Sequence, residues 1–256
     1  MTTSNLKKPQ LVFLDTETTG NDPQKDRLCQ VCYKFADKKD KKGKVVKPGK
    51  LLVKNFKPPV PISIKAMSVT NITNKMVAKE RSFQGSRFAQ ELQEVLNKNI
   101  MVAHNAKFDI AMLAAEGIKV PQHICTLRLA RYLDENSEIP EYSLQFLRYY
   151  YEIELDVIPH SAEGDVLVLE AVFQHLYKEA KKKSNGADRN AIIKRMMEIS
   201  AQPSLIKRFS FGKYNGRLLS EIVLEDRPYL EWLLKTKQAE NDEDWIFTLN
   251  YYLRSQ

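Results

Sequence analysis

Two acidic residues, Asp15 and Glu17, follow directly after a short apolar run, Leu11 to Leu14. Such a run is typical of a buried strand, and residues two apart in a strand point to the same face. The two carboxylates therefore project together, and their repulsion raises the pKa of each unless a cation compensates. Solvated acids at an exposed strand end are the alternative interpretation, and this pattern alone does not separate the two.

Two more acids and a histidine lie near the ends of other predicted elements. Asp109 is in the first turn of a helix that follows an apolar strand at residues 100–103, with Asn105 as its predicted N-cap. A favourable interaction with the helix dipole is the simpler explanation for Asp109. Asp165 lies in a later helix, and His160 precedes that helix on a loop.

Acids at strand ends and helix starts can converge at one edge of a sheet. Four carboxylates there form a hard-oxygen site suited to Mg²⁺ or Mn²⁺ and not to zinc. Two such ions about 4 Å apart hold the attacking and leaving oxygens of a phosphoryl displacement. His160, with an ordinary pKa near 6.5, could then take a proton from the attacking water.

The elements that must position these residues can be followed along the chain. The order β-β-β-α-β-α-β-α, with an antiparallel hairpin at its start, predicts an α/β fold in which helices cover a mixed sheet. Residues 58–73, Pro-rich at first, are expected to form a loop, and Ser82 is the predicted cap of the next helix. The remaining strands are predicted at residues 28–35, 51–56 and 123–125, and the helices at 82–97, 126–133, 142–151 and 162–183.

Composition indicates a globular protein with polyanionic partners. The chain has 256 residues, 43% hydrophobic and 28% charged, and a net charge of +8. It contains no run of eighteen apolar residues and no apolar secretory segment near its start, so no membrane association is expected. Three cysteines fit a reducing compartment, which predicts a cytoplasmic location. Cys29 and Cys32 form a CxxC inside a predicted strand and are interpreted as core residues.

Two segments leave alternatives open. The lysines between residues 38 and 50 could face nucleic acid or could form a solvated hairpin tip. Beyond residue 206, Phe209, Phe211, Tyr214 and Trp232 could stack on bases. In so small a module they could equally be the core.

Three motifs, DTET at 15–18, HNAKFD at 104–109 and HSAEGD at 160–165, resemble in this order those of the DEDDh 3′→5′ exonucleases. The resemblance covers roughly residues 9–178. It implies an RNase H-like fold with a five-stranded mixed sheet flanked by helices. Segments 66–78 and 123–131 look most like the exodeoxyribonuclease X-like members, as does the small C-terminal module.

The resemblance also implies roles for the motif residues. Asp15 would bridge two Mg²⁺ ions, with Mn²⁺ as a substitute. Glu17 and Asp165 would hold the first ion, Asp109 would serve the second, and His160 would be the general base.

Further substrate contacts follow from the same resemblance. Thr16 and Thr18 would touch the terminal nucleotide, and Ile72 would line the base pocket. Thr18 and Ile72 could instead be packing residues. Many relatives carry a His-Gly pair where this chain has Thr70 and Asn71, which puts substrate contacts in that loop in doubt.

The predicted organisation is an exonuclease domain at residues 1–180, a linker with a short helix at 181–206, and a C-terminal module at 207–256. The predicted function is metal-dependent 3′→5′ exodeoxyribonuclease activity that releases nucleoside 5′-monophosphates, in DNA repair or processing. The same chemistry on RNA is the alternative, and a non-catalytic nucleic-acid binder is a third possibility. The partner expected is DNA with a single-stranded 3′ end, or duplex DNA. The sequence does not indicate the oligomeric state.

Overall fold

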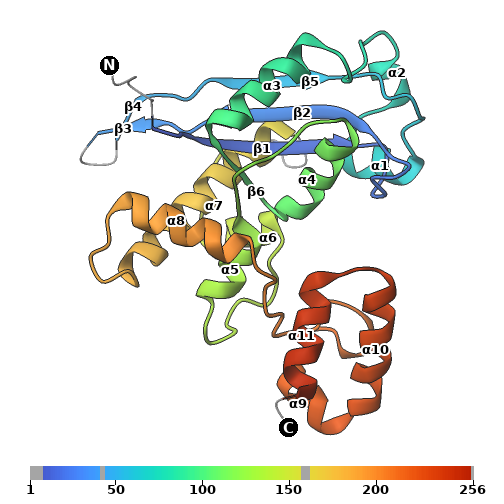
Figure 1. Cartoon of the computed structure of the whole chain (residues 1–256), viewed down its shortest axis with the longest axis vertical. Coiled ribbons are helices and arrows are strands. Elements are labelled where there is room, and N and C mark those ends of the chain that lie inside the picture. The colour runs from blue at the N-terminus through green and yellow to red at the C-terminus, as the bar shows by residue number, and fades with distance from the viewer. Residues whose placement is uncertain (1–7, 41–43, 157–161, 255–256) are drawn as a thin grey trace, which may run out of the picture. The chain divides into compact units, whose positions relative to one another are not determined.

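The computed structural model describes residues 8–40, 44–156 and 162–254, which fold into two compact units (Figure 1). The first unit consists of Met1–Thr126 and Ile153–Phe173, and the second of Leu127–Glu152 and Gln174–Gln256. Within the described residues, no helix is long and apolar enough to cross a membrane.

A five-stranded mixed sheet forms the centre of the first unit, as the sequence predicts. The strand order is β5-β2-β1-β6-β7, and β1 pairs antiparallel with β2 but parallel with β6. The apolar run at the start of β1 is buried, as expected for a central strand between two covered faces. The strands are β1 (Leu11–Thr18), β2 (Leu28–Phe35), β5 (Leu51–Asn55), β6 (Ile100–Ala103) and β7 (His123–Cys125). A separate two-stranded ribbon joins β3 (Lys38–Lys39) to β4 (Val45–Lys47).

The helices of this unit correct two details of the sequence interpretation. Part of the segment expected as a loop forms α1 (Ile64–Thr70), because the Ser63 side chain caps it by accepting from the amide of Ala66. Helix α3 is capped by Ser86, four residues later than predicted. The other helices here are α2 (Asn74–Val77), α4 (Ala106–Ala115) and the first half of α7 (Ala162–Lys182); α3 spans Arg87–Lys98.

Aromatic and ionic contacts fasten α7 to the sheet. The rings of Phe13 and Phe173 meet edge to face with centroids 5.5 Å apart. Lys34 on β2, itself buried, forms ion pairs with Glu170 on α7 and with Asp37. Because α7 carries Asp165 in its first turn, these contacts fix an acid against the sheet.

The second unit is helical. Its C-terminal part has a core around Phe209, which is 1% exposed and packs with Leu219, Leu230 and Leu249. Phe209 is therefore a core residue and not a stacking platform, whereas Trp232 remains 57% exposed. The helices are α5 (Thr126–Leu133, from its second residue), α6 (Leu144–Tyr150), α8 (Arg189–Ser200), α9 (Leu219–Glu225), α10 (Arg227–Ala239) and α11 (Glu243–Arg254).

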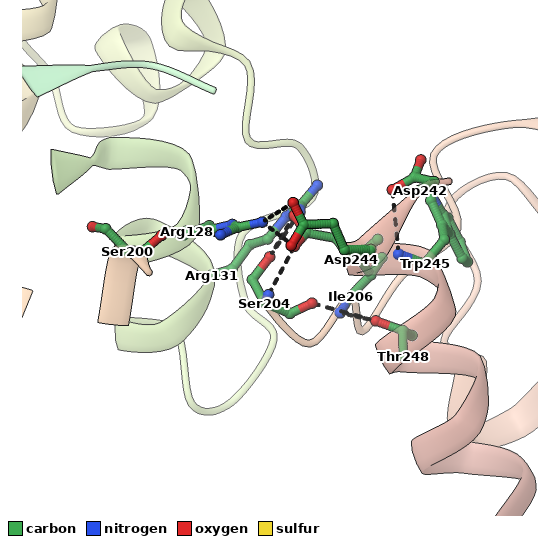
Figure 2. A network of polar contacts seen from close by, with 10 residues as sticks. Arg128, Arg131, Ser200, Ser204, Ile206, Asp242, Asp244, Trp245 and Thr248 are labelled. Atoms are coloured by element: carbon green, nitrogen blue, oxygen red, sulfur yellow. Dashed lines mark hydrogen bonds and ion pairs between the residues drawn. The ribbon is translucent and has the colours of Figure 1, made fainter. Parts of the chain in front are cut away.

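A polar cluster in this unit, the Asp244 network, consists of Arg128, Arg131, Ser200, Ser204 and Asp244 (Figure 2). The Asp244 carboxylate lies 3.0 Å from Arg128 and 3.2 Å from Arg131. It also accepts hydrogen bonds from the amide and the hydroxyl of Ser204, and Arg128 donates to the Ser200 carbonyl. Both oxygens of this carboxylate thus have donors from α5 and from the segment after α8.

Candidate active site

Three acids meet beside the carboxyl end of β1. Asp15 and Glu17 lie two residues apart on that strand, and Asp165 comes from the first turn of α7. One carboxylate oxygen from each of the three lies within 4.8 Å of the others. The period of a strand places the first two on one face, and the α7 contacts described above bring in the third.

Asp109 completes the group from the other side. It lies in the first turn of α4, directly after β6, which runs parallel to β1 and ends at the same edge of the sheet. Its side chain is only 3% exposed and accepts a 2.8 Å hydrogen bond from the Thr16 hydroxyl. Asn105 occupies the N-cap position as predicted, but in a left-handed conformation (φ 55°) and without a side-chain capping bond. These four residues, Asp15, Glu17, Asp109 and Asp165, are called the acid cluster below.

The surroundings of the acid cluster disfavour the ionised form of its carboxylates. Burial, followed by repulsion from Asp109, Glu17 and Asp165, raises the pKa of Asp15 well above its ordinary value. Burial and the charges of Asp165 and Asp109 raise the pKa of Glu17 to about 7. Burial raises the pKa of Asp109 to about 7, although hydrogen bonds from Thr16 oppose the shift.

A divalent cation fits this donor set. In the described part of the chain, no lysine or arginine forms an ion pair with Asp15, Glu17 or Asp109. Closely spaced carboxylate oxygens are the ligands that hard cations prefer, and a bound cation would lower the three raised pKa values. The cluster is therefore suited to a divalent metal ion.

The other predicted site residues have mixed outcomes. His160 lies outside the described residues, so its role stays a prediction. Thr16 and Thr18 line a pocket of about 670 Å³ beside Glu17. Their hydroxyls are engaged within the chain, the first by Asp109 and the second by the carbonyl of Gly20 at 2.6 Å. Ile72 is buried in an apolar cluster with Cys29, Ile62 and Val77, which favours a packing role.

Sequence interpretation missed several residues of this pocket wall. Among them, Ser63, Lys65 and Val69 line it from α1 or its cap, and Phe108 lines it from α4. The α1 residues were missed because the segment was expected to be a loop. His104, the first residue of the HNAKFD motif, is engaged within the chain, with Nδ1 2.9 Å from the Thr126 hydroxyl.

Comparison with known proteins identifies the family of this chain. The family model described as Exonuclease matches residues 12–173, which include the whole acid cluster. The chain belongs to the exonuclease family. It is accordingly a hydrolytic enzyme of that family. A second model, the exodeoxyribonuclease X-like C-terminal module, matches residues 209–238.

Individual relatives agree with this assignment. Exodeoxyribonuclease 10 of Escherichia coli strain K12 is 28% identical over 218 residues, which cover 83% of this chain and 88% of the relative. The structure of exonuclease X in complex with 5′-overhanging duplex DNA superimposes with a TM-score of 0.55 at 24% identity, covering 74% of this chain and 99% of that one. E. coli exonuclease I in complex with a dT13 oligonucleotide gives a TM-score of 0.55 at 20% identity, covering 70% and 43%. The two structures share the fold of the exonuclease domain.

Proposed function

We propose that this exonuclease is a 3′→5′ exodeoxyribonuclease that releases nucleoside 5′-monophosphates, in DNA repair or processing. The observation that carries the proposal is the acid cluster, in which three carboxylate oxygens lie within 4.8 Å of one another and no lysine or arginine of the described residues pairs with Asp15 or Glu17. The choice of DNA is supported by the exodeoxyribonuclease 10 relative, and the net charge of +8 favours a polyanionic substrate of either kind.

The acid cluster would hold two Mg²⁺ ions, with Mn²⁺ as a substitute. Asp15 would bridge them, Glu17 and Asp165 would complete the first site, and Asp109 would serve the second. When bound, such ions supply Lewis-acid stabilisation of the charge that develops on the phosphate and lower the pKa of water. Thr16 holds the Asp109 carboxylate in place through its 2.8 Å hydrogen bond.

The remaining steps belong to side chains around the cluster. His160, in the neutral form, would accept the proton of the attacking water. The terminal nucleotide would occupy the 670 Å³ pocket beside Glu17, in contact with Thr16 and Thr18. Because Ile72 is buried in its apolar cluster, only the edge of that cluster would contact the base. We assign this activity to a domain at residues 1–180, which a linker at 181–206 joins to the module at 207–256. We place the protein in the cytoplasm, in line with its three free cysteines.

The deciding experiment is digestion of 5′-labelled single-stranded DNA, duplex DNA and RNA of one sequence, with Mg²⁺, Mn²⁺ or EDTA. We expect a ladder that shortens from the 3′ end on DNA with either metal and no cleavage in EDTA. Equal or faster digestion of RNA would select the exoribonuclease alternative. Binding without cleavage under all metal conditions would leave only the non-catalytic reading.

The role of His160 is tested by its alanine variant in single-turnover reactions from pH 6 to pH 9. Loss of the general base should slow cleavage roughly 10²- to 10⁴-fold. The deficit should shrink at alkaline pH, where hydroxide replaces the base. An unchanged rate in a folded variant would remove His160 from the mechanism.

A further inference from the structure

Four exposed lysines gather on the β3–β4 ribbon and at the start of the neighbouring edge strand β5. They are Lys38, Lys44, Lys47 and Lys50, called the lysine ribbon here. None of the four forms an ion pair in the described residues. Val46, between two of them, is 63% exposed and adds an apolar surface.

Some exposed cations elsewhere in the chain are compensated by a nearby acid. Exposed Lys25, Lys98, Lys182 and Arg87 each pair with a carboxylate three or four residues away. The lysine ribbon instead has four lysines within a short stretch of chain, with Asp40 as the one exposed acid among them in the described residues. Its complement is a polyanion with regularly spaced charges.

The strand register places the lysine ribbon relative to the acid cluster. In β2, Gln30 is level with Glu17 of β1, whereas Phe35 is level with Val12. The ribbon continues from the Phe35 end, opposite to the edge where the acids lie, and Figure 1 shows β3 and β4 at the far end of the sheet from α1. Five residues of strand separate the two levels, which is about 17 Å.

We propose that the lysine ribbon binds the phosphate backbone of the DNA substrate at a distance from the 3′ end that is cleaved. This inference rests on the proposed function. With about 3.4 Å of helix axis per nucleotide of one strand, 17 Å corresponds to roughly five nucleotides of a helical strand. The lysine ribbon therefore contacts long substrates and not the shortest ones.

Lysines on a sheet edge also discourage pairing with other strands, and this protective role needs no ligand. The test must therefore measure the binding of DNA directly. The ribbon variant carries Lys44→Gln, Lys47→Gln and Lys50→Gln. The matched control carries Arg87→Gln, Lys98→Gln and Lys182→Gln, which removes the same charge from residues that are already ion-paired.

Binding of a labelled 20-nucleotide single strand is measured by fluorescence anisotropy in EDTA, from 0.05 to 0.3 M salt. Loss of three phosphate contacts should reduce the slope of log Kd against log salt by about 2 and weaken binding about 10- to 100-fold at 0.1 M salt. The control variant should change the affinity less than about threefold. A variant with arginine at the same three ribbon positions should restore binding.

Cleavage with Mg²⁺ separates this inference from the proposed function. All variants should digest a four-nucleotide strand equally, and only the ribbon variant should lose kcat/KM on the 20-nucleotide strand. No digestion of either strand by the unaltered protein would refute the proposed function, while the anisotropy arm still decides the ribbon. Equal salt slopes for the ribbon and control variants, or equally effective competition by poly-glutamate, would overturn the assignment to DNA.

Discussion

The acid cluster of the first unit and the Asp244 network of the second solve the same problem in opposite ways. Both place carboxylates where water is largely excluded. Asp244 receives two guanidinium groups and two donors from Ser204 (Figure 2). Within the described residues Asp15 and Glu17 form no ion pair, and the charges that shift their pKa values are those of other acids.

The contrast separates a structural charge from a functional one. A buried carboxylate with complete partners holds elements together, and removing one partner is destabilising because it leaves the other charge unpaired. A group of carboxylates without cations is a source of instability that a ligand can relieve. Perturbed pKa values in such a group are typical of functional sites.

The largest expected effect is that of Asp15→Asn. Because Asp15 is the shared ligand, its loss should lower the single-turnover rate with Mg²⁺ at least about 10³-fold, which corresponds to several kcal/mol of lost charge stabilisation. In EDTA at pH 8 the same variant should melt at a higher temperature than the unaltered protein, because one of the repelling charges is gone. Near-normal activity would disprove the site assignment.

In the Asp244 network, removal of an acid should destabilise the folded protein instead of stabilising it. Asp244→Ala leaves Arg128 and Arg131 without their shared partner and should lower the free energy of unfolding by about 3 kcal/mol. The matched control is Glu243→Gln, one residue earlier on α11, whose carboxylate lies 3.5 Å from Arg128 but is half exposed. It should change stability by less than about 1 kcal/mol. Urea unfolding measures both, and equal losses would mean that exposure does not distinguish the two pairs.

A smaller effect is expected at Thr16, which connects β1 to Asp109. Thr16→Val removes the hydroxyl with little change of shape and should weaken Mn²⁺ binding about 10- to 100-fold, as for other groups that orient metal ligands. Thr16→Ser keeps the donor and should bind close to normally. Calorimetric titration of both variants tests this, and equal affinities would show that the hydrogen bond does not position Asp109.

A pH dependence of stability is expected in the metal-free protein. The folded-state pKa of Glu17 and of Asp109 is about 7, against ordinary values of 4.5 and 3.8. Between these limits the folded chain binds more protons than the unfolded chain, so stability should fall as pH rises from about 4.5 to 7 and then level off. Melting curves in EDTA should show a shallower fall for Glu17→Gln, and saturating Mg²⁺ should remove the difference. Identical pH profiles for both proteins in EDTA would contradict the raised pKa of Glu17.

Part of this architecture could be read from the sequence because the signals are local. The segments 28–35, 100–103 and 123–125 coincide with β2, β6 and β7, each a short apolar run that ends in turn residues or a helix start. Asp15 and Glu17 could be paired from strand periodicity alone. Asp109 and Asp165 were predicted as their partners because strand ends and helix starts can meet at one edge of a sheet, and the family resemblance then implied a separate role for each acid.

Other features depend on contacts that no local pattern encodes. Helix α1 was missed because it is seven residues long and has no fully buried residue, so it shows no apolar stripe. Ser82 and Ser86 are equally good caps in sequence, and tertiary packing decides between them. The hydrogen bond from Thr16 to Asp109 joins residues 93 positions apart, and Asp244 is one of several acids that could have met Arg128.

The discontinuous build of the first unit bears on how the enzyme is made. Its strands and α4 precede residue 127, but the helix that brings Asp165 follows an excursion of the chain into the second unit. Ribosomes add about 5–20 residues per second, so Asp165 emerges roughly 8 to 30 seconds after Asp15. During that interval the nascent chain lacks at least one of its four acids. Synthesis order thus delays nuclease activity until most of the catalytic unit has left the ribosome.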